Sequence, residues 1–305
     1  MASDKNTNPN NKTIVLAGAT GDLGGRIARS LLERGANVRA IIRPGSNSDK
    51  VEALRRQGVS IAEADFKSVS ELSKACAGGD CVVSALSGLQ EVMLEAQRVL
   101  LYAAVEAGVP YFIPSDFAID YTKLPRGTNR NLDLRKEFKE RLDKAPIRAT
   151  SILNGMFTDL LTEQAPVILF PLNRVIYYGD ADQPLDFTTI DNTAVYTAAA
   201  ALDPKAPRYL RIVGDVLSAR GLAEAASQAT GKEFKLFRVG GLGTLDTMIK
   251  VTRALMPKSD DVFPPWQGMQ YLRNMFSGQA KLDPLDNDRY PNIHWTPVRE
   301  VVATR

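Results

Sequence analysis

Short apolar runs alternate with amphipathic segments along the first half of the chain. The runs are rich in β-branched residues and have the length of buried strands; they cover residues 13–16, 38–42, 59–63, 80–84, 111–114 and 148–153. The segments between them, among them 26–34, 68–77 and 90–107, keep apolar side chains on one helical face. Strands that alternate with helices form a parallel sheet through right-handed crossovers. The pattern therefore predicts an α/β fold, a Rossmann-type doubly wound parallel sheet.

The pattern changes in the second half of the chain. A helix is expected over 155–164, but the strands beyond Pro166 are short, and later helices are rich in methionine and aromatic residues. We therefore expect a Rossmann domain over 13–165, which a strand near 209–213 rejoins at the sheet edge. Residues 166–305 should form a smaller α/β lobe that binds substrate. Residues 1–12, rich in asparagine, are expected to be a disordered tail.

The first strand ends in a turn with the spacing Gly-x-x-Gly-x-x-Gly. Gly18 allows a tight turn, Gly21 lets backbone N–H groups approach a pyrophosphate, and Gly24 lets the helix pack close to the strand. The helix N-terminus then offers unpaired N–H groups to phosphates. Strand, turn and helix occur in the order that a dinucleotide site requires; a turn with a purely structural role is the alternative. The residues expected to bind the cofactor here are Gly18, Thr20, Gly21, Asp22, Leu23 and Gly24.

The end of the second strand indicates which dinucleotide is bound. An acidic residue there would hold the ribose hydroxyl of NAD, and a basic residue would hold the 2′-phosphate of NADP. Arg43 occupies this place, whereas the first carboxylate, Asp49, comes too late. Arginine matches phosphate oxygens with two parallel hydrogen bonds, and Ser46 and Lys50 could add contacts. The sequence therefore favours NADP(H), with a solvated surface arginine as the alternative.

Two further strand ends are expected to border the cofactor. Asp65 and Phe66 follow the third strand, where a loop could border the adenine. Ser84 and Ala85 end the fourth strand, and small residues there let the backbone pass close to a cofactor. Because ligands bind outside the carboxyl ends of parallel strands, these ends should converge on one crevice.

Composition narrows the classes of partner. The 305 residues are 44% apolar, and the net charge of +3 is too small and scattered to indicate nucleic acid as the main partner. Cys76 and Cys81, with His294 as the single histidine, predict neither a metal site nor a disulfide framework. The N-terminus has no apolar signal-peptide region, and the longest apolar run, Ala194 to Leu202, is too short to span a membrane. We expect a cytoplasmic protein without a membrane partner.

Several motifs recur in one order and together carry a family resemblance. They are Gly18 to Gly24, Ile42-Arg43, Val83 to Ala85, Ile113 to Phe117 and Ser151 to Phe157. In this combination the chain, from about residue 12 to 203, resembles the NmrA-like and isoflavone-reductase-like branch of atypical short-chain dehydrogenases/reductases. The resemblance implies NADP(H) as cofactor. Some members reduce small aromatic or phenylpropanoid-type substrates, and others only sense the cofactor ratio.

The resemblance also implies binding residues. Pro-Ser-Asp-Phe at 114–117 is similar to the family's Pro-Ser-Glu-Phe, which places Pro114 and Ser115 at the cofactor. The segment 154–157 resembles the loop that borders the nicotinamide, which adds Asn154, Gly155 and Phe157. We expect the substrate to contact Asp116, Phe117, Met156, Tyr178 and Trp266.

The catalytic group is expected on the helix over 131–142. Ordinary short-chain dehydrogenases use Tyr-x-x-x-Lys, and none of the nine tyrosines has lysine four residues later, which also disfavours a sugar-nucleotide epimerase. Reductases of the resembling branch use a lysine on this helix. Alignment of its apolar positions places Arg135 on the lysine site, with Lys136 adjacent and about 100° away. Arginine is a poor general acid but can hold an anionic oxygen; a solvated helix face is the alternative.

Two functions follow as hypotheses. The first is an NADPH-dependent reductase of a small apolar or aromatic carbonyl, enone or quinone-type substrate, acting as a monomer or homodimer. The second is a non-catalytic NADP(H)-binding redox sensor that changes its affinity for a regulatory protein partner. NADPH consumption across a substrate panel separates the two.

Overall fold

The first part of the chain builds a six-stranded parallel sheet. The structure, a computed structural model, describes residues 12–162, 164–256 and 260–305, so most of the expected tail lies outside the described residues. The strands lie in the order β3-β2-β1-β4-β5-β6, and their bounds are β1 Thr13–Ala17, β2 Asn37–Ile42, β3 Ser60–Glu63, β4 Cys81–Ser84, β5 Tyr111–Ile113 and β6 Arg148–Ala149. All neighbours in the sheet pair in parallel. This order confirms the Rossmann-type sheet.

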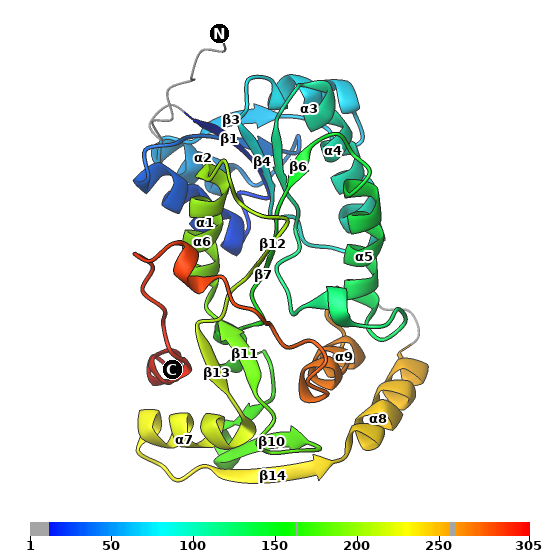
Figure 1. The fold of residues 1–305 in the computed structure, drawn as a ribbon, viewed down its shortest axis with the longest axis vertical. Coiled ribbons are helices and arrows are strands. Elements are labelled where there is room, and N and C mark those ends of the chain that lie inside the picture. The colour runs from blue at the N-terminus through cyan, green and yellow to red at the C-terminus, as the bar shows by residue number, and fades with distance from the viewer. Residues whose placement is uncertain (1–11, 163, 257–259) are drawn as a thin grey trace. The chain divides into compact units, whose positions relative to one another are not determined.

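Helices cover both faces of this sheet (Figure 1). Their bounds are α1 Asp22–Glu33, α2 Ser48–Arg56, α3 Val69–Cys76, α4 Gln97–Glu106, α5 Arg130–Leu142 and α6 Ile190–Leu202. The helix expected over 90–107 forms, but its first turns, Glu91–Ala96, are wound as a π-helix. The residues of β4 and most of β1 are buried, and Cys76 and Cys81 are buried free thiols, as expected of core cysteines. Burial raises the pKa of Cys76 to about 12.

The N-terminus of α3 shows how local sequence selects an element boundary. Ser68 is the N-cap, and its side chain accepts a hydrogen bond from the Glu71 amide. A capping box would return the Glu71 carboxylate to the Ser68 amide. Instead, the Glu71 carboxylate accepts from the Asp65 amide at 2.9 Å. The helix start therefore also fixes the loop that leaves β3.

The chain divides into two compact units, each assembled from separate segments. The first unit comprises Met1–Asp116, Glu137–Ser151 and Ala194–Tyr209, and the second comprises the segments 117–136, 152–193 and 210–305. The contiguous boundary expected at residue 165 differs from this division. Residues 117–136 and 152–165 group with the second unit, and most of α6 groups with the first.

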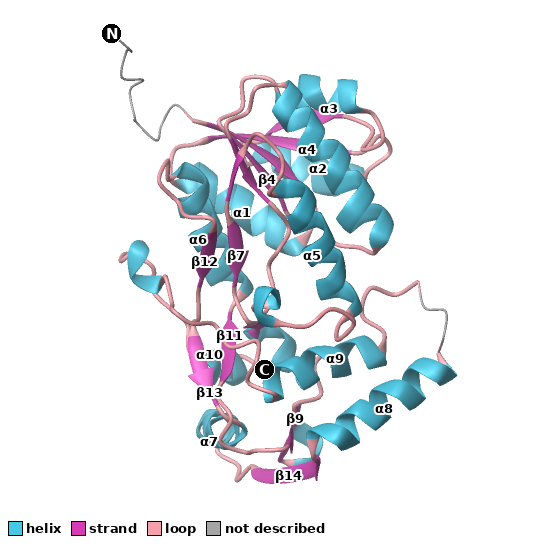
Figure 2. Ribbon diagram, turned by 45° about the vertical axis from the view of Figure 1, so that its right-hand side comes forward, coloured by secondary structure: helices cyan, strands magenta, loops and turns pink. Residues whose placement is uncertain are grey.

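The second unit contains two small sheets and several helices (Figure 2). One sheet has the strand order β14-β10-β9 and the other β13-β11-β8. The strand bounds are β8 Met156–Phe157, β9 Ile168–Leu169, β10 Arg174–Tyr178, β11 Leu185–Thr188, β13 Asp215–Leu217 and β14 Lys235–Gly240. The helices are α7 Ala219–Thr230, α8 Leu242–Leu255, α9 Pro265–Phe276 and α10 Val298–Ala303, with short 3₁₀ turns η3 Tyr121–Lys123, η4 Thr158–Thr162, η5 Phe170–Leu172 and η6 Asn287–Arg289.

Two expectations for this part of the chain are wrong. No single helix covers 155–164, because Gly155 has a left-handed φ of +70° and the next two residues form β8 against β11. The strand expected over 148–153 is also divided. Its second half, β7 (Ser151–Leu153), leaves the large sheet and pairs with β12 (Tyr209–Arg211). The strand near 209–213 therefore forms a two-stranded sheet rather than an edge of the large one.

Candidate functional site

The glycine turn after β1 brings backbone segments into close contact. Gly18 has φ +88°, and a Cβ there would lie 2.4 Å from the Ala85 carbonyl oxygen. A Cβ at Gly24 would lie 2.1 Å from the Gly18 carbonyl oxygen. Real side chains do not tolerate such contacts, so α1, the turn and the end of β4 approach one another only because these two residues are glycines.

Gly21 has a different role from the other two glycines. It is the N-cap of α1, with an ordinary φ of −82° and no side chain to cap the helix. The first N–H groups of a helix have no partner within the helix. The adjoining Asp22 carboxylate is held 2.7 Å from Arg26. The exposed start of α1 thus retains the backbone donors and the dipole end that bind phosphate in dinucleotide folds.

Arg43 lies at the exposed end of β2, where the ribose phosphate was expected. It lines a hollow of about 380 Å³ together with Ser46 and residues of α2. The Ser46 hydroxyl donates to the Arg43 carbonyl at 2.6 Å, which fixes the turn and leaves the hydroxyl oxygen able to accept. Lys50 is in the first turn of α2 and does not line this hollow. The structure therefore brings Arg43 and Ser46 together without Lys50.

The ends of β3 and β4 hold the next group of predicted residues. Phe66 is buried, and the Asp65 carboxylate accepts from the Lys67 amide at 3.0 Å. The Ala85 amide donates to the Ala17 carbonyl at 2.8 Å. The buried Ser84 hydroxyl has no hydrogen-bond partner among the described residues. Buried polar atoms in proteins normally have a partner, so Ser84 is suited to meet a ligand atom.

A buried glutamine fixes the loop after β5. The Gln97 side chain is fully buried; its amide donates to the Met93 carbonyl and its oxygen accepts from the Ser115 backbone amide at 2.8 Å. The Ser115 hydroxyl donates to the Leu86 carbonyl. Pro114 and Ser115 are thereby held at the end of β5. No local sequence pattern indicates this role of Gln97, because the contact joins residues 18 positions apart.

Asp116 follows this loop and is buried in the first unit. The Ser151 hydroxyl donates to its carboxylate at 2.6 Å, and Arg208 donates to the same Ser151 oxygen at 2.7 Å. Arg208 is in turn bound to Asp143 at 2.9 Å. The Ser151 hydroxyl therefore links the Asp116 carboxylate to the Arg208 guanidinium. Whether Asp116 also meets a substrate stays a prediction.

Lys136, one of the two residues expected to be catalytic, is held at the edge of the second unit. Its Nζ donates to the Leu124 carbonyl at 2.6 Å and lies 3.7 Å from an Asp133 carboxylate oxygen. Only 9% of the residue is exposed. Burial lowers the pKa of Lys136 below its ordinary value, the Asp133 carboxylate opposes this effect, and Arg126 adds to it. A lysine with a lowered pKa is a better general acid near neutrality.

Arg135, the neighbouring candidate, has a different environment. One guanidinium nitrogen donates to the Asn131 carbonyl of its own helix at 3.1 Å. Its Nε atom is buried and has no hydrogen-bond partner among the described residues. Arg135 can therefore still donate to an anionic atom. Which of the two residues acts stays a prediction.

The loop at 154–157 contains a buried amide with unused hydrogen-bonding groups. The Asn154 and Gly155 backbone amides both donate to the Ala118 carbonyl. The Asn154 side chain is fully buried, and neither its oxygen nor its nitrogen has a partner among the described residues. Gly155 has a left-handed φ, and a Cβ there would lie 2.4 Å from the Asp186 carbonyl oxygen. Asn154 thus has a donor and an acceptor available, which match the two functions of a ligand carboxamide.

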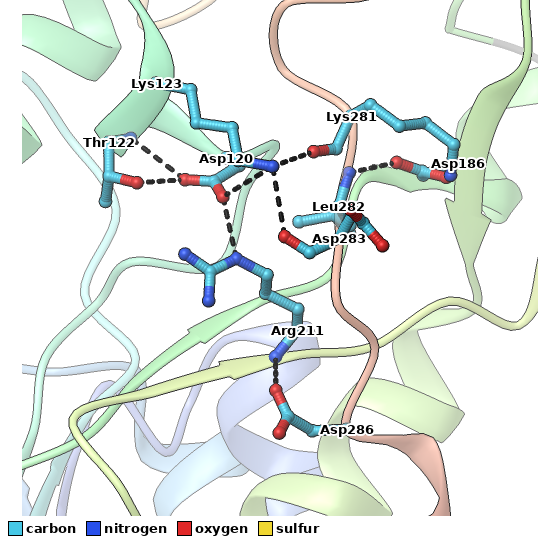
Figure 3. A network of polar contacts seen from close by, with 9 residues as sticks. All are labelled: Asp120, Thr122, Lys123, Asp186, Arg211, Lys281, Leu282, Asp283 and Asp286. Atoms are coloured by element: carbon cyan, nitrogen blue, oxygen red, sulfur yellow. Dashed lines mark hydrogen bonds and ion pairs between the residues drawn. The ribbon is translucent and has the colours of Figure 1, made fainter.

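A polar network in the second unit supports both the segment that binds Lys136 and the loop at 154–157 (Figure 3). The fully buried Asp120 accepts from Thr122 and from the Arg211 guanidinium at 2.8 Å. Lys123 donates to the carbonyls of Lys281 and Asp283. Asp186 accepts from the Leu282 amide at 2.7 Å and from the Lys281 side chain.

The network makes the segment 280–286 a common support. It anchors η3, which leads to the Leu124 carbonyl that holds Lys136. It also anchors Asp186, against which Gly155 lies. Asp286 completes the support by accepting from the Arg211 amide at 2.8 Å.

The residues expected to contact substrate are mostly buried. Phe117, Tyr178 and Trp266 are less than 9% exposed. The Tyr178 ring packs edge-on against Phe276, and burial raises the pKa of its hydroxyl. The Trp266 ring is stacked by the Arg130 guanidinium, 4.6 Å from the ring centre. Tyr178 and Trp266 therefore contribute to core packing, and their contact with a substrate stays a prediction.

A comparison of most of the chain with known protein families shows which family it belongs to. The profile of the NmrA-like family matches residues 10–276. The chain belongs to the NmrA-like family. The resemblance drawn from the glycine turn, Arg43 and the 154–157 loop is confirmed.

Several relatives of this NmrA-like protein are reductases. Pinoresinol reductase 2 of Arabidopsis thaliana is 31% identical over 256 residues, which are 78% of this chain and 80% of the relative. Bifunctional pinoresinol-lariciresinol reductase 1 of Linum usitatissimum is 28% identical over 238 residues, 73% of this chain and 76% of the relative.

Solved structures share the NmrA-like fold over nearly the whole chain. AtPrR2 with NADP+ and (+)pinoresinol has a TM-score of 0.82 at 23% identity, covering 96% of this chain and 98% of that one. The NADPH-dependent quinone oxidoreductase QOR2 of Escherichia coli, complexed with NADPH, has a TM-score of 0.75 at 20% identity, covering 95% and 99%. At these identities the likeness shows the fold.

Two other features of the described residues bear on function. No helix there is long and apolar enough to cross a membrane. No group of three or more histidine, cysteine or acidic residues among them could hold a metal ion. The backbone carbonyl of His294, the single histidine, accepts from the Asn192 side chain at 2.7 Å.

Proposed function

We propose that this protein is an NADP(H)-dependent oxidoreductase that reduces a small apolar or aromatic substrate of the carbonyl, enone or quinone type. The observation that carries the proposal is the uncapped N-terminus of α1 behind the close-packed Gly18 and Gly24, with Arg43 at the end of the next strand. This arrangement offers donors to a pyrophosphate and a guanidinium to a 2′-phosphate. The names of a relative, pinoresinol reductase 2, and of a structural neighbour, the NADPH-dependent quinone oxidoreductase QOR2, support the same conclusion.

The protein residues would bind, orient and supply charge, while the cofactor when bound supplies the hydride. Gly18 to Gly24 would hold the pyrophosphate, and Arg43 with Ser46 the 2′-phosphate. The unused carboxamide of Asn154 would hold the nicotinamide amide. Lys136 would keep a proton near the oxygen that gains charge, and Arg135 would stabilise that charge without giving up its own proton.

Substrate identity is proposed only as a class. The relatives include a protein named pinoresinol reductase and one named isoflavone reductase homolog, and quinones are the class named for QOR2.

The test is NADPH oxidation by the purified protein across a panel of quinones, enones and furan-type lignans. We expect turnover with at least one of them and a clear preference for NADPH over NADH. Arg43→Asp should reduce that preference by roughly ten- to a hundredfold, because a charged hydrogen-bond partner is lost. Lys136→Met should lower kcat by about a hundredfold or more with little change in NADPH affinity.

Lys139→Met is the matched control, because Lys139 is on the same helix and pairs with Asp143. Its kcat should equal that of the wild type. If Arg135→Met abolishes turnover and Lys136→Met does not, the role on this helix is electrostatic. NADPH binding without turnover of any panel member would reject the reductase and favour the sensor, whose partner affinity would then depend on the cofactor's redox state.

A further inference from the structure

Lys136 is enclosed by a loop that is fastened to its own helix. The loop runs from Leu124 to Asn129 and is bound at both ends. The Leu124 carbonyl accepts from Lys136 Nζ, and the Asn129 side chain accepts from the Leu132 amide at 3.2 Å. Between them, the Gly127 amide donates to the Asp133 carboxylate at 2.8 Å. Three hydrogen bonds therefore fix this loop to the helix beside the Lys136 ammonium.

Two side chains of opposite charge act on that ammonium. Asp133 lies one helical turn before Lys136, with a carboxylate oxygen 3.7 Å from Nζ. That oxygen is buried and makes no hydrogen bond among the described residues, since the other oxygen receives the Gly127 amide. Arg126, from the enclosing loop, contributes a positive charge whose repulsion lowers the pKa of Lys136. One carboxylate oxygen is thus left to interact with the ammonium alone.

We propose that Asp133 is a positioning residue that keeps Lys136 protonated, and that Arg126 opposes it. This inference rests on the proposed function, in which Lys136 supplies a proton. A buried ammonium loses hydration and tends to become neutral, so a lysine in this place needs a compensating negative charge to remain a proton donor. The free Asp133 oxygen provides that charge, while the oxygen bound to Gly127 fixes its position.

The sign of each substitution follows from the charges. Removal of the Asp133 charge should lower the pKa of Lys136, and removal of the Arg126 charge should raise it. An opposite charge within 4–6 Å changes a pKa by about one to three units. Because the Asp133 side chain is 26% exposed, we expect the lower end of that range. Asp133→Asn is the suitable variant, because its amide oxygen can still accept from Gly127.

The experiment measures Lys136 directly. Protein labelled with ¹³C at the lysine ε-carbons is titrated by NMR, and the Lys136 signal is assigned by its absence in Lys136→Met. In Asp133→Asn we expect the Lys136 midpoint about one pH unit below that of the wild type. In Arg126→Met it should lie above the wild type. Glu137→Gln is the matched control and should leave the Lys136 midpoint unchanged. In the wild type, the Glu137 carboxylate pairs with Arg141 of the same helix at 2.8 Å.

Steady-state kinetics provide the second measurement. A lysine acid loses activity as pH rises through its pKa, so the alkaline limb of kcat should shift to lower pH in Asp133→Asn by the same amount, with KM for NADPH unchanged. Unchanged Lys136 midpoints in both Asp133→Asn and Arg126→Met would overturn the inference. Because the NMR titration needs no turnover, shifted midpoints in a protein that oxidises no NADPH would instead reject the proposed function alone.

Discussion

The two units hold their predicted ligand-binding groups by different means. In the first unit, backbone lies against backbone: Gly18 and Gly24 allow contacts that a Cβ would prevent, and strand ends supply the remaining groups. In the second unit, side chains hold the groups: Asp120, Arg211 and the segment 280–286 support the turn whose end binds Lys136 and the strand against which the Asn154 loop lies. The glycine turn cannot accommodate an added side-chain atom. The ionic network of the second unit depends on each of its charged side chains.

The largest expected effect comes from breaking the ionic network of the second unit. Arg211→Met removes the guanidinium that binds Asp120, whose side chain is fully buried. Loss of this partner leaves a buried charge poorly compensated, because the Asp120 carboxylate keeps the hydrogen bonds from Thr122 but the ammonium of Lys123 lies 3.8 Å away. We expect the free energy of unfolding to fall by about 3 kcal/mol, measured by urea denaturation.

Arg220→Met is the matched control for this substitution. Arg220 pairs with Asp182 at 2.9 Å, nearly the same distance, but both side chains are 63% exposed. Exposed ion pairs contribute little, so the control should unfold at the same urea concentration as the wild type. Equal losses in the two variants would show that burial of Asp120 does not distinguish the network from the surface pair.

The same contrast explains what the sequence could predict. The turn from Thr13 to Gly24 is encoded within twelve consecutive residues, so the strand, the glycine spacing and the helix can be recognised together. The parallel sheet follows from the repetition of strand and helix along the chain, and the cofactor class follows from Arg43 at the end of the second strand. By contrast, the Arg211–Asp120 and Leu282–Asp186 contacts join residues 91 and 96 positions apart. No local pattern indicates such pairs.

The errors in the second unit have the same origin. Apolar side chains recur at helical spacing in residues 155–164, but the pairing of Met156 with Phe187 competes with a helix, and Gly155 adopts φ +70° to make that pairing possible. Tertiary pairing overrode local preference there.

Gln97, in the first unit, could not be predicted for a related reason. A glutamine within an amphipathic helix does not reveal that its side chain will accept a hydrogen bond from the Ser115 amide.

The second prediction distinguishes the roles of Gly24 and Gly21 in the first unit. Gly24→Ala would place a methyl group 2.1 Å from the Gly18 carbonyl oxygen, which belongs to rigid backbone. We expect the free energy of unfolding to fall by about 2–3 kcal/mol, together with loss of NADPH binding, because the turn must open. At Gly21 the nearest atom to an added Cβ is 3.3 Å away, and φ is ordinary.

Gly21→Val should therefore unfold close to the wild type yet bind no NADPH, because its side chain projects from the backbone that a pyrophosphate must approach. Thermal denaturation and isothermal titration calorimetry measure the two properties on the same samples. A folded Gly21→Val protein with unchanged NADPH affinity would mean that the turn is structural only. Normal stability of Gly24→Ala would mean that the close contact is not needed.

The smallest expected effect has the opposite sign and concerns Asn154. Its buried carboxamide has no partner among the described residues, and an unsatisfied buried polar group costs about 1–3 kcal/mol. Asn154→Leu removes that cost at similar volume, so the free energy of unfolding of the cofactor-free protein should rise by about 1 kcal/mol. Affinity for NADPH should fall, because the carboxamide proposed to hold the nicotinamide is lost.

Asn129→Leu is the control that gives this prediction its meaning. Asn129 is equally buried, but its side chain accepts from Gln267 at 2.7 Å and from the Leu132 amide and donates to Asn274. The same substitution there leaves those partners unsatisfied and should destabilise the protein. Opposite changes in stability at the two asparagines would mark Asn154 as a group kept at the expense of stability for a ligand. A loss of stability in Asn154→Leu as well would show that its amide already contributes to the fold, and the proposed nicotinamide contact would lose its support.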